Sequence, residues 1–112
     1  MVSRELIAAS TRPLVLAVLS KGESYGYSII QQVRELSAGE LEWSEGMLYP
    51  VLHRLEQEKL IIGSWKESES GRKRKYYRVS ASGGRAMATE RQQWQAVHDT
   101  LTSLWESKPC LT

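Results

Sequence analysis

The sequence predicts a mainly α-helical protein with one small β-hairpin, an α+β fold class, and three observations support that prediction. Apolar residues recur at helical spacing in three successive segments that precede residue 60. Residues 60–80 then follow a strand pattern around a polar loop that contains Gly71. A last helical pattern fills residues 81–107. We therefore expect a domain over residues 4–80 and a long C-terminal helix over residues 81–107.

Length and composition limit the class of protein. A chain of 112 residues, 25% of them charged and 41% hydrophobic, is typical of one folded domain with a modest core. The sequence has no apolar run long enough to span a membrane and no signal-peptide pattern. Its single cysteine, Cys110, cannot form a disulfide within the chain. Together these features favour a cytoplasmic protein without a membrane partner.

Two helices are expected before residue 40. The first covers residues 4–20, where Pro13 lacks an N–H and crowds the preceding turn, so we expect a kink there or a helix that restarts at Pro13. The second covers about residues 25–37, with Ser24 as its N-cap. Its expected buried stripe consists of Ile29, Ile30, Val33 and Leu36.

The third helix, within residues 43–59, carries the first functional candidates. Ser44 is suited to its N-cap. The expected buried stripe consists of Leu48, Val51, Leu52 and Leu55. The opposite face carries Tyr49, His53, Arg54 and Gln57. Such a helix is able to present hydrogen-bonding and cationic groups to a DNA major groove, although an ordinary surface helix shows the same general pattern.

The hairpin that follows has a basic tip. Two strands, residues 60–67 and 73–80, flank the polar loop, and Arg72, Lys73, Arg74 and Lys75 are consecutive cations. Three helices followed by such a hairpin are the order of a winged helix-turn-helix domain, in which the hairpin, or wing, lies along the DNA backbone or enters the minor groove. Because strand side chains alternate between faces, only two or three of these cations can face DNA. The candidate DNA-binding residues are Ser44, Tyr49, His53, Arg54, Arg72, Lys73, Arg74 and Lys75.

The C-terminal helix has a heptad-like seam. Its apolar positions are Met87, Trp94, Val97, Leu101 and Leu104, and Glu90 interrupts them. A helix this long exposes more apolar surface than a small domain covers, so we expect these five residues to form a two-fold homodimer interface. The other interpretation is that the helix packs on the first helix of its own chain.

Several segments resemble the PadR family of bacterial transcriptional regulators. They are Tyr25-Gly26-Tyr27, Leu48-Tyr49-Pro50, Leu55-Glu56, Leu60-Ile61 and the run from Gly71 to Arg78. The similarity extends from about Leu6 to Leu104 and is greatest to the small branch, particularly its multidrug-binding members. It implies a dimeric winged-helix repressor of operator DNA that responds to an effector or a stress signal.

Two positions depart from the family pattern. Met47 stands where the family usually has threonine, so this chain lacks a hydroxyl that would bind phosphate or cap the helix. Lys59 replaces the usual glycine before the first strand. If Lys59 takes a left-handed backbone conformation, the cost is about 1 kcal/mol.

Trp94 and Glu90 are the candidate effector-binding residues. Near a two-fold axis, two copies of Trp94 would form a flat slot for a planar aromatic molecule, and Glu90 would favour a cationic one. Trp94 also matches the tryptophan that sandwiches drugs in the multidrug-binding members that the chain resembles. The other interpretation is a closed interface in which Trp94 belongs to the core.

Other functional classes have less support. His53 and His98 lie on separate helices without further ligands at zinc spacing, so we expect no metal site. No phosphate-binding glycine loop and no nucleophile elbow are present, so we expect neither an enzyme nor a cofactor. A winged domain used only for protein contacts is the second hypothesis, but four consecutive cations favour a polyanion as the partner.

Overall fold

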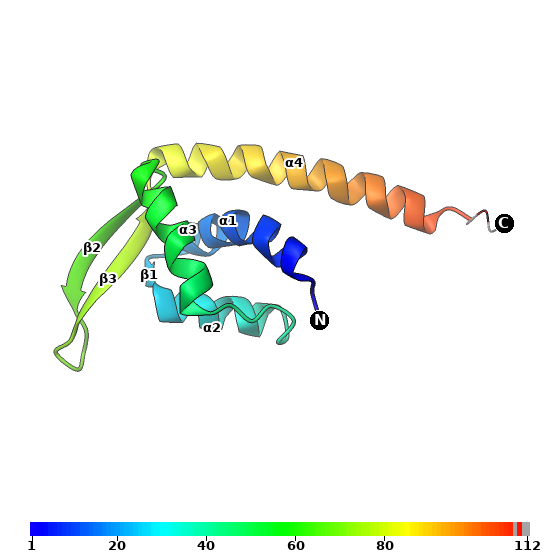
Figure 1. Ribbon diagram of the computed structural model, residues 1–112. Coiled ribbons are helices and arrows are strands. Elements are labelled where there is room, and N and C mark those ends of the chain that lie inside the picture. The colour runs from blue at the N-terminus through cyan, green and yellow to red at the C-terminus, as the bar shows by residue number, and fades with distance from the viewer. Residues whose placement is uncertain (109, 111–112) are drawn as a thin grey trace.

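The computed structural model describes residues 1–108 and 110. Their elements are α1 (Arg4–Ser20), β1 (Ser24–Tyr25), α2 (Gly26–Leu36), α3 (Glu45–Gln57), β2 (Ile61–Glu67), β3 (Lys73–Val79) and α4 (Ala81–Glu106). In Figure 1 the β2–β3 hairpin projects at one end of the domain, with α3 beside it and α4 lying over α1. The expected fold class and the winged helix-turn-helix arrangement are confirmed.

The first two helices differ from the expectation at three points. Leu36, which was expected in the buried stripe of α2, is 82% exposed. Helix α1 continues without interruption through Pro13, so it does not restart there. Helix α2 begins at Gly26 with Tyr25 as its N-cap residue, and the prediction that Ser24 caps it was wrong. Ser24 instead belongs to β1, where its buried hydroxyl accepts a hydrogen bond from Gln32 Nε2 at 3.2 Å.

The short strand β1 makes the sheet three-stranded, in the order β1-β3-β2. It pairs antiparallel with β3, with Ser24 opposite Tyr77 and Tyr25 opposite Tyr76. Its two residues are too few to show a strand period, which is why the sequence pattern did not reveal it. This pairing attaches the start of α2 to the base of the wing.

The core lies where the three N-terminal helices meet the base of the sheet. Its fully buried large side chains include Leu16, Ile29, Leu48, Leu52, Leu55 and Ile61. The two adjacent tyrosines of β3 lie on opposite faces of the sheet, because Tyr77 is buried and Tyr76 packs edge-on against Tyr25. Burial raises the pKa of the Tyr77 hydroxyl.

The turn between α3 and β2 contains the departure noted at Lys59. Lys59 has a φ of 62°, so it takes the left-handed conformation that carries this cost. The Leu60 amide donates to the Leu55 carbonyl at 3.0 Å and the Lys59 amide donates to the Glu56 carbonyl at 3.0 Å, which together form a Schellman motif. The last carbonyls of α3 are thereby satisfied, although the usual glycine is absent.

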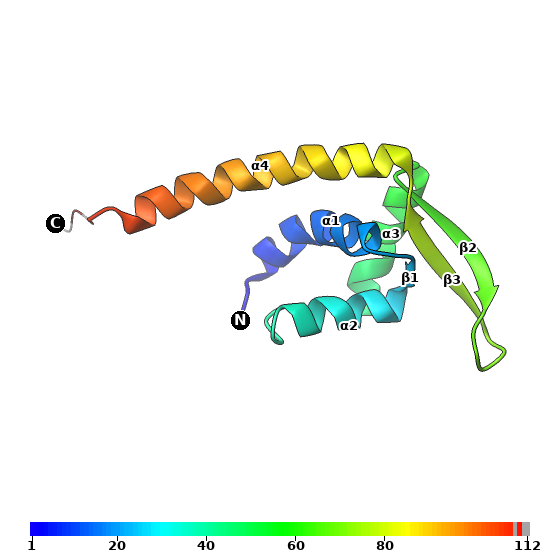
Figure 2. The ribbon, with the colours of Figure 1, turned by 180° about the vertical axis from the view of Figure 1, so that it is seen from behind.

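Helix α4 both packs on its own chain and extends beyond it. Its first turn is capped by Ser80, whose hydroxyl accepts from the Gly83 amide at 3.0 Å. Its first half runs alongside α1, and its second half passes the end of α1, as Figures 1 and 2 both show. The chain, with α4 included, consequently measures 63 × 28 × 20 Å along its principal axes. Within the described part of the chain, no helix combines the length and the apolarity that a membrane crossing requires.

Candidate nucleic-acid interface

Helix α3 presents an exposed face that begins at its N-cap. Ser44 caps the helix as predicted, and its hydroxyl accepts from the Met47 amide at 3.2 Å. The predicted buried stripe is confirmed, with Leu48, Leu52 and Leu55 fully buried and Val51 partly buried. The exposed residues on the opposite face are Gly46, Pro50, His53, Arg54 and Gln57. Gly46 and Pro50 were not among the sequence candidates, and both keep the backbone of this face accessible.

Tyr49 lies at the edge of the exposed face. Its side chain is 45% exposed, so it is available to a ligand. Its hydroxyl also rests against Gly26 at the start of α2, where an added Cβ would meet that oxygen at 2.7 Å. Tyr49 therefore supports the packing of α2 on α3 and remains accessible to a ligand.

The four cations of the wing divide into two pairs. Arg72 and Lys73 are exposed and form no ion pair with any residue that the structure describes. The guanidinium of Arg74 lies 4.4 Å from the centre of the Tyr25 ring, a cation–π contact on the sheet face. Lys75 Nζ donates to Glu56 Oε1 at 2.8 Å, and this hydrogen bond raises the pKa of the Lys75 ammonium. Lys75 thus has a protein partner.

Gly63 on β2 leaves space for the Lys75–Glu56 pair. A Cβ at residue 63 would overlap the Lys75 side chain and approach Glu56 Oε2 at 2.7 Å. Of the four wing cations, Arg72 and Lys73 are the most accessible in this arrangement, and the number that faces DNA stays a prediction.

An open groove of about 560 Å³ separates α3 from the wing. Tyr49 lines its helix side, and all four wing cations, Arg72, Lys73, Arg74 and Lys75, line its wing side. Sequence reasoning missed further lining residues, namely Tyr25, Tyr27, Glu45 and Trp65. The resemblance had drawn attention to Tyr25 and Tyr27, but nothing in the strand pattern of residues 60–67 indicated which face Trp65 would take. The groove combines aromatic and basic groups, which suits a nucleic acid.

Comparison with known proteins identifies this arrangement. The sequence pattern of the transcriptional regulator PadR-like family matches residues 15–89, which include α2, α3 and the whole wing. The chain belongs to the PadR family. A transcriptional regulator of Mycobacterium tuberculosis, Rv3488, is 34% identical over 89 residues, which are 80% of this chain and 79% of that protein.

Other relatives agree with this assignment. The crystal structure of a PadR-like transcriptional regulator from Bacillus cereus is 31% identical, with a TM-score of 0.81 over 93% of this chain and 99% of that one. The transcriptional regulator YqjI of Escherichia coli is 28% identical over 90 residues, and the chain spans only 42% of the length of YqjI. This protein is therefore a transcriptional regulator of the PadR type, a family that implies DNA binding.

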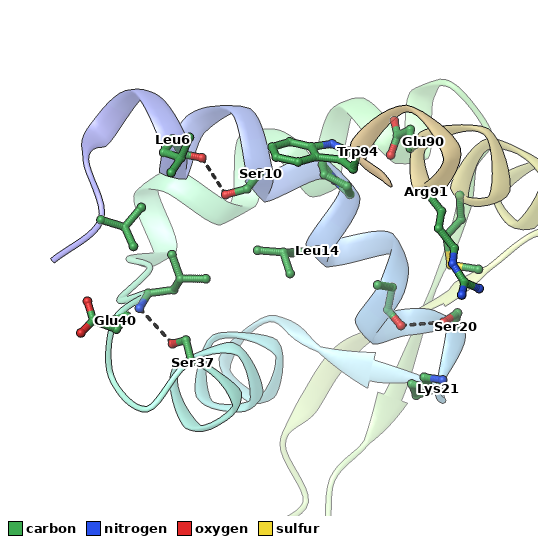
Figure 3. Close-up of a pocket in the computed structure, with 15 residues that line it drawn as sticks. Leu6, Ser10, Leu14, Ser20, Lys21, Ser37, Glu40, Glu90, Arg91 and Trp94 are labelled. Atoms are coloured by element: carbon green, nitrogen blue, oxygen red, sulfur yellow. Dashed lines mark hydrogen bonds between the residues drawn. The ribbon is translucent and has the colours of Figure 1, made fainter. Parts of the chain in front are cut away.

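A second site lies between α1 and α4 of this PadR protein. It is an open, mostly apolar pocket of about 650 Å³, with Leu14 in its middle and Trp94 and Glu90 projecting from α4 at its upper edge (Figure 3). Trp94 is 40% exposed. Met87, one of the predicted interface residues, is partly buried against the core of its own chain and also lines this pocket.

The remaining predicted interface residues lie farther along α4, where the helix has passed α1. Val97, Leu101 and Leu104 are 55%, 39% and 65% exposed, and Trp105 beyond them is 73% exposed. Four large, exposed apolar side chains in one part of a helix are unusual for a protein surface that faces water. The predicted seam is therefore divided between a part that faces α1 and a part that is uncovered in a single chain.

Three charged residues connect α4 with α1 and α3 behind the pocket. Arg12 Nε donates to Glu90 Oε1 at 2.9 Å, and Arg12 Nη1 and Nη2 donate to the Glu58 carboxylate at 2.7 and 3.3 Å. These hydrogen bonds raise the pKa of Arg12, and the bond from Arg12 lowers the pKa of Glu58. Glu90 Oε2 is shielded from solvent and has no hydrogen-bond partner among the described residues.

Proposed function

We propose that this PadR protein is a homodimeric repressor that binds double-stranded operator DNA in the cytoplasm. Helix α3 enters the major groove and the wing follows the adjacent backbone. The observation that carries this proposal is the groove in which Tyr49 on α3 faces Arg72 and Lys73 on the wing. A duplex that enters it meets hydrogen-bonding side chains on one side and cations without a protein partner on the other.

The two sides of the groove have different roles. His53 and Arg54 lie on the exposed part of α3 and are positioned for base edges or neighbouring phosphates. Ser44 holds the helix N-terminus in place, and amides at such a terminus attract phosphate oxygens. Arg72 and Lys73 contribute binding that does not depend on sequence, whereas Arg74 and Lys75 shape the wing through Tyr25 and Glu56 and contact DNA secondarily.

The second copy of the chain is supported by the uncovered part of α4. A two-fold partner that packs on Val97, Leu101 and Leu104 removes these side chains from water. Such a dimer presents two α3 helices to pseudo-palindromic half-sites about one helical turn apart. Trp94 lies where the pocket meets the uncovered surface, and Met87 contributes from its position against α1.

The effector is a planar aromatic molecule that carries a positive charge. Trp94 offers an apolar surface for stacking, and Glu90 on the preceding turn offers an anion. Binding next to α4 provides a route by which such a molecule releases operator DNA.

DNA binding is tested by incubating the purified protein with sheared DNA from its own genome and sequencing the fragments that it retains. The proposal predicts enrichment of a few sites that share a pseudo-palindrome, and an affinity that falls steeply with salt. Retention of no specific fragment would favour the second hypothesis, a winged domain that binds only proteins.

Effector binding is tested without DNA, by titrating a planar cationic dye and following tryptophan fluorescence. The proposal predicts saturable quenching that is lost in Trp94→Ala while light scattering still reports a dimer. Trp105→Ala is the matched control, because Trp105 lies on the same helix but outside the pocket. Equal quenching in all three proteins would exclude Trp94 from the binding site.

A further inference from the structure

We propose that Arg12 is the positioning residue that couples the pocket between α1 and α4 to helix α3, and that a cationic group bound at Glu90 operates this coupling. The inference rests on the proposed function and concerns the regulation of the same site. Arg12 comes from α1, Glu58 is the C-cap residue of α3, and Glu90 lies on α4. One guanidinium thus connects the helix that carries the dimer surface to the end of the helix that enters DNA.

Arg12 contacts both carboxylates through different nitrogens of its guanidinium. Its Nε is occupied by Glu90, while Nη1 and Nη2 are both directed to Glu58. A planar guanidinium is able to serve two carboxylates in fixed directions at the same time. The side chains of Arg12 and Glu90 are 35% and 20% exposed and that of Glu58 is 44% exposed, so water screens the Glu58 end of this connection more than the Glu90 end.

The two carboxylate oxygens of Glu90 differ in their hydrogen bonding. Oε1 accepts from Arg12, whereas Oε2 is shielded from water and accepts nothing from the described residues. A shielded carboxylate oxygen without a donor leaves part of the negative charge of Glu90 uncompensated, and a positive charge held in the pocket relieves this through space. The pocket is also lined by two cations, Lys21 and Arg91, and one further anion, Glu40. All three are solvent-exposed, so water screens their charges better than it screens that of Glu90.

Arg12 and a cation bound in the pocket would share the carboxylate of Glu90. A bound cation competes with Arg12 for the negative charge of Glu90, so the link from α4 to Arg12 weakens while the link from Arg12 to Glu58 remains. In the dimer, α4 determines where the two copies of α3 lie relative to each other. A looser link between α4 and α3 reduces the chance that both half-sites are engaged together, and operator affinity falls.

The probe for this coupling is tetraphenylphosphonium, an apolar aryl cation that is too bulky to intercalate into DNA. Anisotropy of a labelled operator, taken from the retained fragments, measures DNA affinity with and without the probe. For the wild type we expect operator binding to weaken by about 5- to 150-fold at saturating probe, the usual range for coupled sites. Tetraphenylborate has nearly the same shape and the opposite charge, and we expect it to leave operator binding unchanged.

Arg12→Gln and Glu58→Gln separate coupling from damage to the fold. Without the probe, both variants should bind operator about as weakly as the wild type does at saturating probe, and the probe should change that affinity less than about 2-fold, because the link to α3 is already broken. Arg12→Gln should also bind the probe several-fold more tightly than the wild type, because Glu90 is no longer neutralised. Glu58→Gln should bind the probe as the wild type does. Arg34→Gln is the matched control, since Arg34 pairs with Glu42 at 3.5 Å away from the pocket, and it should keep full coupling.

The outcomes distinguish this inference from the proposed function. A wild-type protein that retains no specific DNA contradicts the proposed function itself. A wild type that binds operator but shows no saturable quenching of its tryptophan fluorescence by the probe overturns the cation site at Glu90. A wild type that binds both operator and probe, yet keeps its operator affinity, overturns the coupling. Full coupling in Arg12→Gln or in Glu58→Gln also overturns it, as does weaker probe binding by a folded, dimeric Arg12→Gln.

Discussion

Gly83, in the first turn of α4, lies directly against the backbone carbonyl of Leu60 in the turn between α3 and β2. A Cβ at residue 83 would overlap the carbonyl oxygen of Leu60, which as a backbone atom has little freedom to move. Gly84, its neighbour, has no heavy atom within 4 Å of the same ideal position. The start of α4 is therefore seated on the end of α3 through one glycine.

Gly83→Ala should destabilise the protein by about 1–3 kcal/mol, because α4 must move away from Leu60. Gly84→Ala is the matched control, and it should increase stability by up to about 1 kcal/mol, because alanine favours the helix and meets nothing. Urea denaturation followed by circular dichroism measures both changes. Similar midpoints for the two variants would show that the contact at residue 83 is not tight.

Lys59→Gly should stabilise the fold by about 1 kcal/mol. Lys59 has a φ of 62°, where a Cβ is unfavourable and glycine is not. Lys21→Gly is the matched control, because Lys21 also follows a helix but has a φ of −86°. Glycine there only raises the conformational entropy of the unfolded chain, which lowers stability. The same denaturation experiment decides the prediction, and a loss of stability in both variants would contradict it.

Replacing Arg72 and Lys73 together by alanine should weaken binding to every DNA sequence by a similar factor. The two side chains are exposed and carry charges without protein partners, so the substitutions remove cations that face phosphates and leave base readout intact. The slope of log affinity against log salt should become shallower by about 0.9 for each phosphate that is no longer neutralised. Arg34→Ala, on the end of α2 away from the groove, is the control and should leave the slope unchanged.

The sequence predicted the helices, the hairpin and the buried stripe of α3 because each has a clear period and a local stop signal. It did not predict β1, because two residues show no period and Ser24 has an equally good local role as a helix cap. The sequence predicted how many wing cations could face a ligand, but it did not predict which ones. The partners of Lys75 and Arg74, which are Glu56 and Tyr25, come from other elements. The cluster of Arg12, Glu58 and Glu90 was not predicted for the same reason: its members are brought together only by packing.

Leu101→Glu combined with Leu104→Glu should convert the proposed dimer to a monomer. The two leucines are uncovered in a single chain, so the monomer should tolerate the charges, whereas burying them at an interface is costly. Light scattering should report half the mass, with an unchanged circular dichroism spectrum and no specific operator binding. Gln92→Glu combined with Gln95→Glu adds the same charge to exposed polar positions of α4 and serves as the control. A double leucine variant that remains a dimer would place the interface elsewhere.

The ion pair of Glu58 with Arg12 should make stability depend on pH in a defined window. Arg12 lowers the pKa of the Glu58 carboxyl in the folded protein, so the pair stabilises the fold above the ordinary glutamate value of about 4.3. That contribution is lost as the pH falls through the lowered pKa. The difference in urea midpoint between the wild type and Glu58→Gln should therefore be constant from neutral pH to about pH 5 and vanish at lower pH. Glu35→Gln, at an exposed position of α2, should show no such window. A difference that persists unchanged at about pH 3 would mean that Glu58 stabilises the protein through packing and not through its charge.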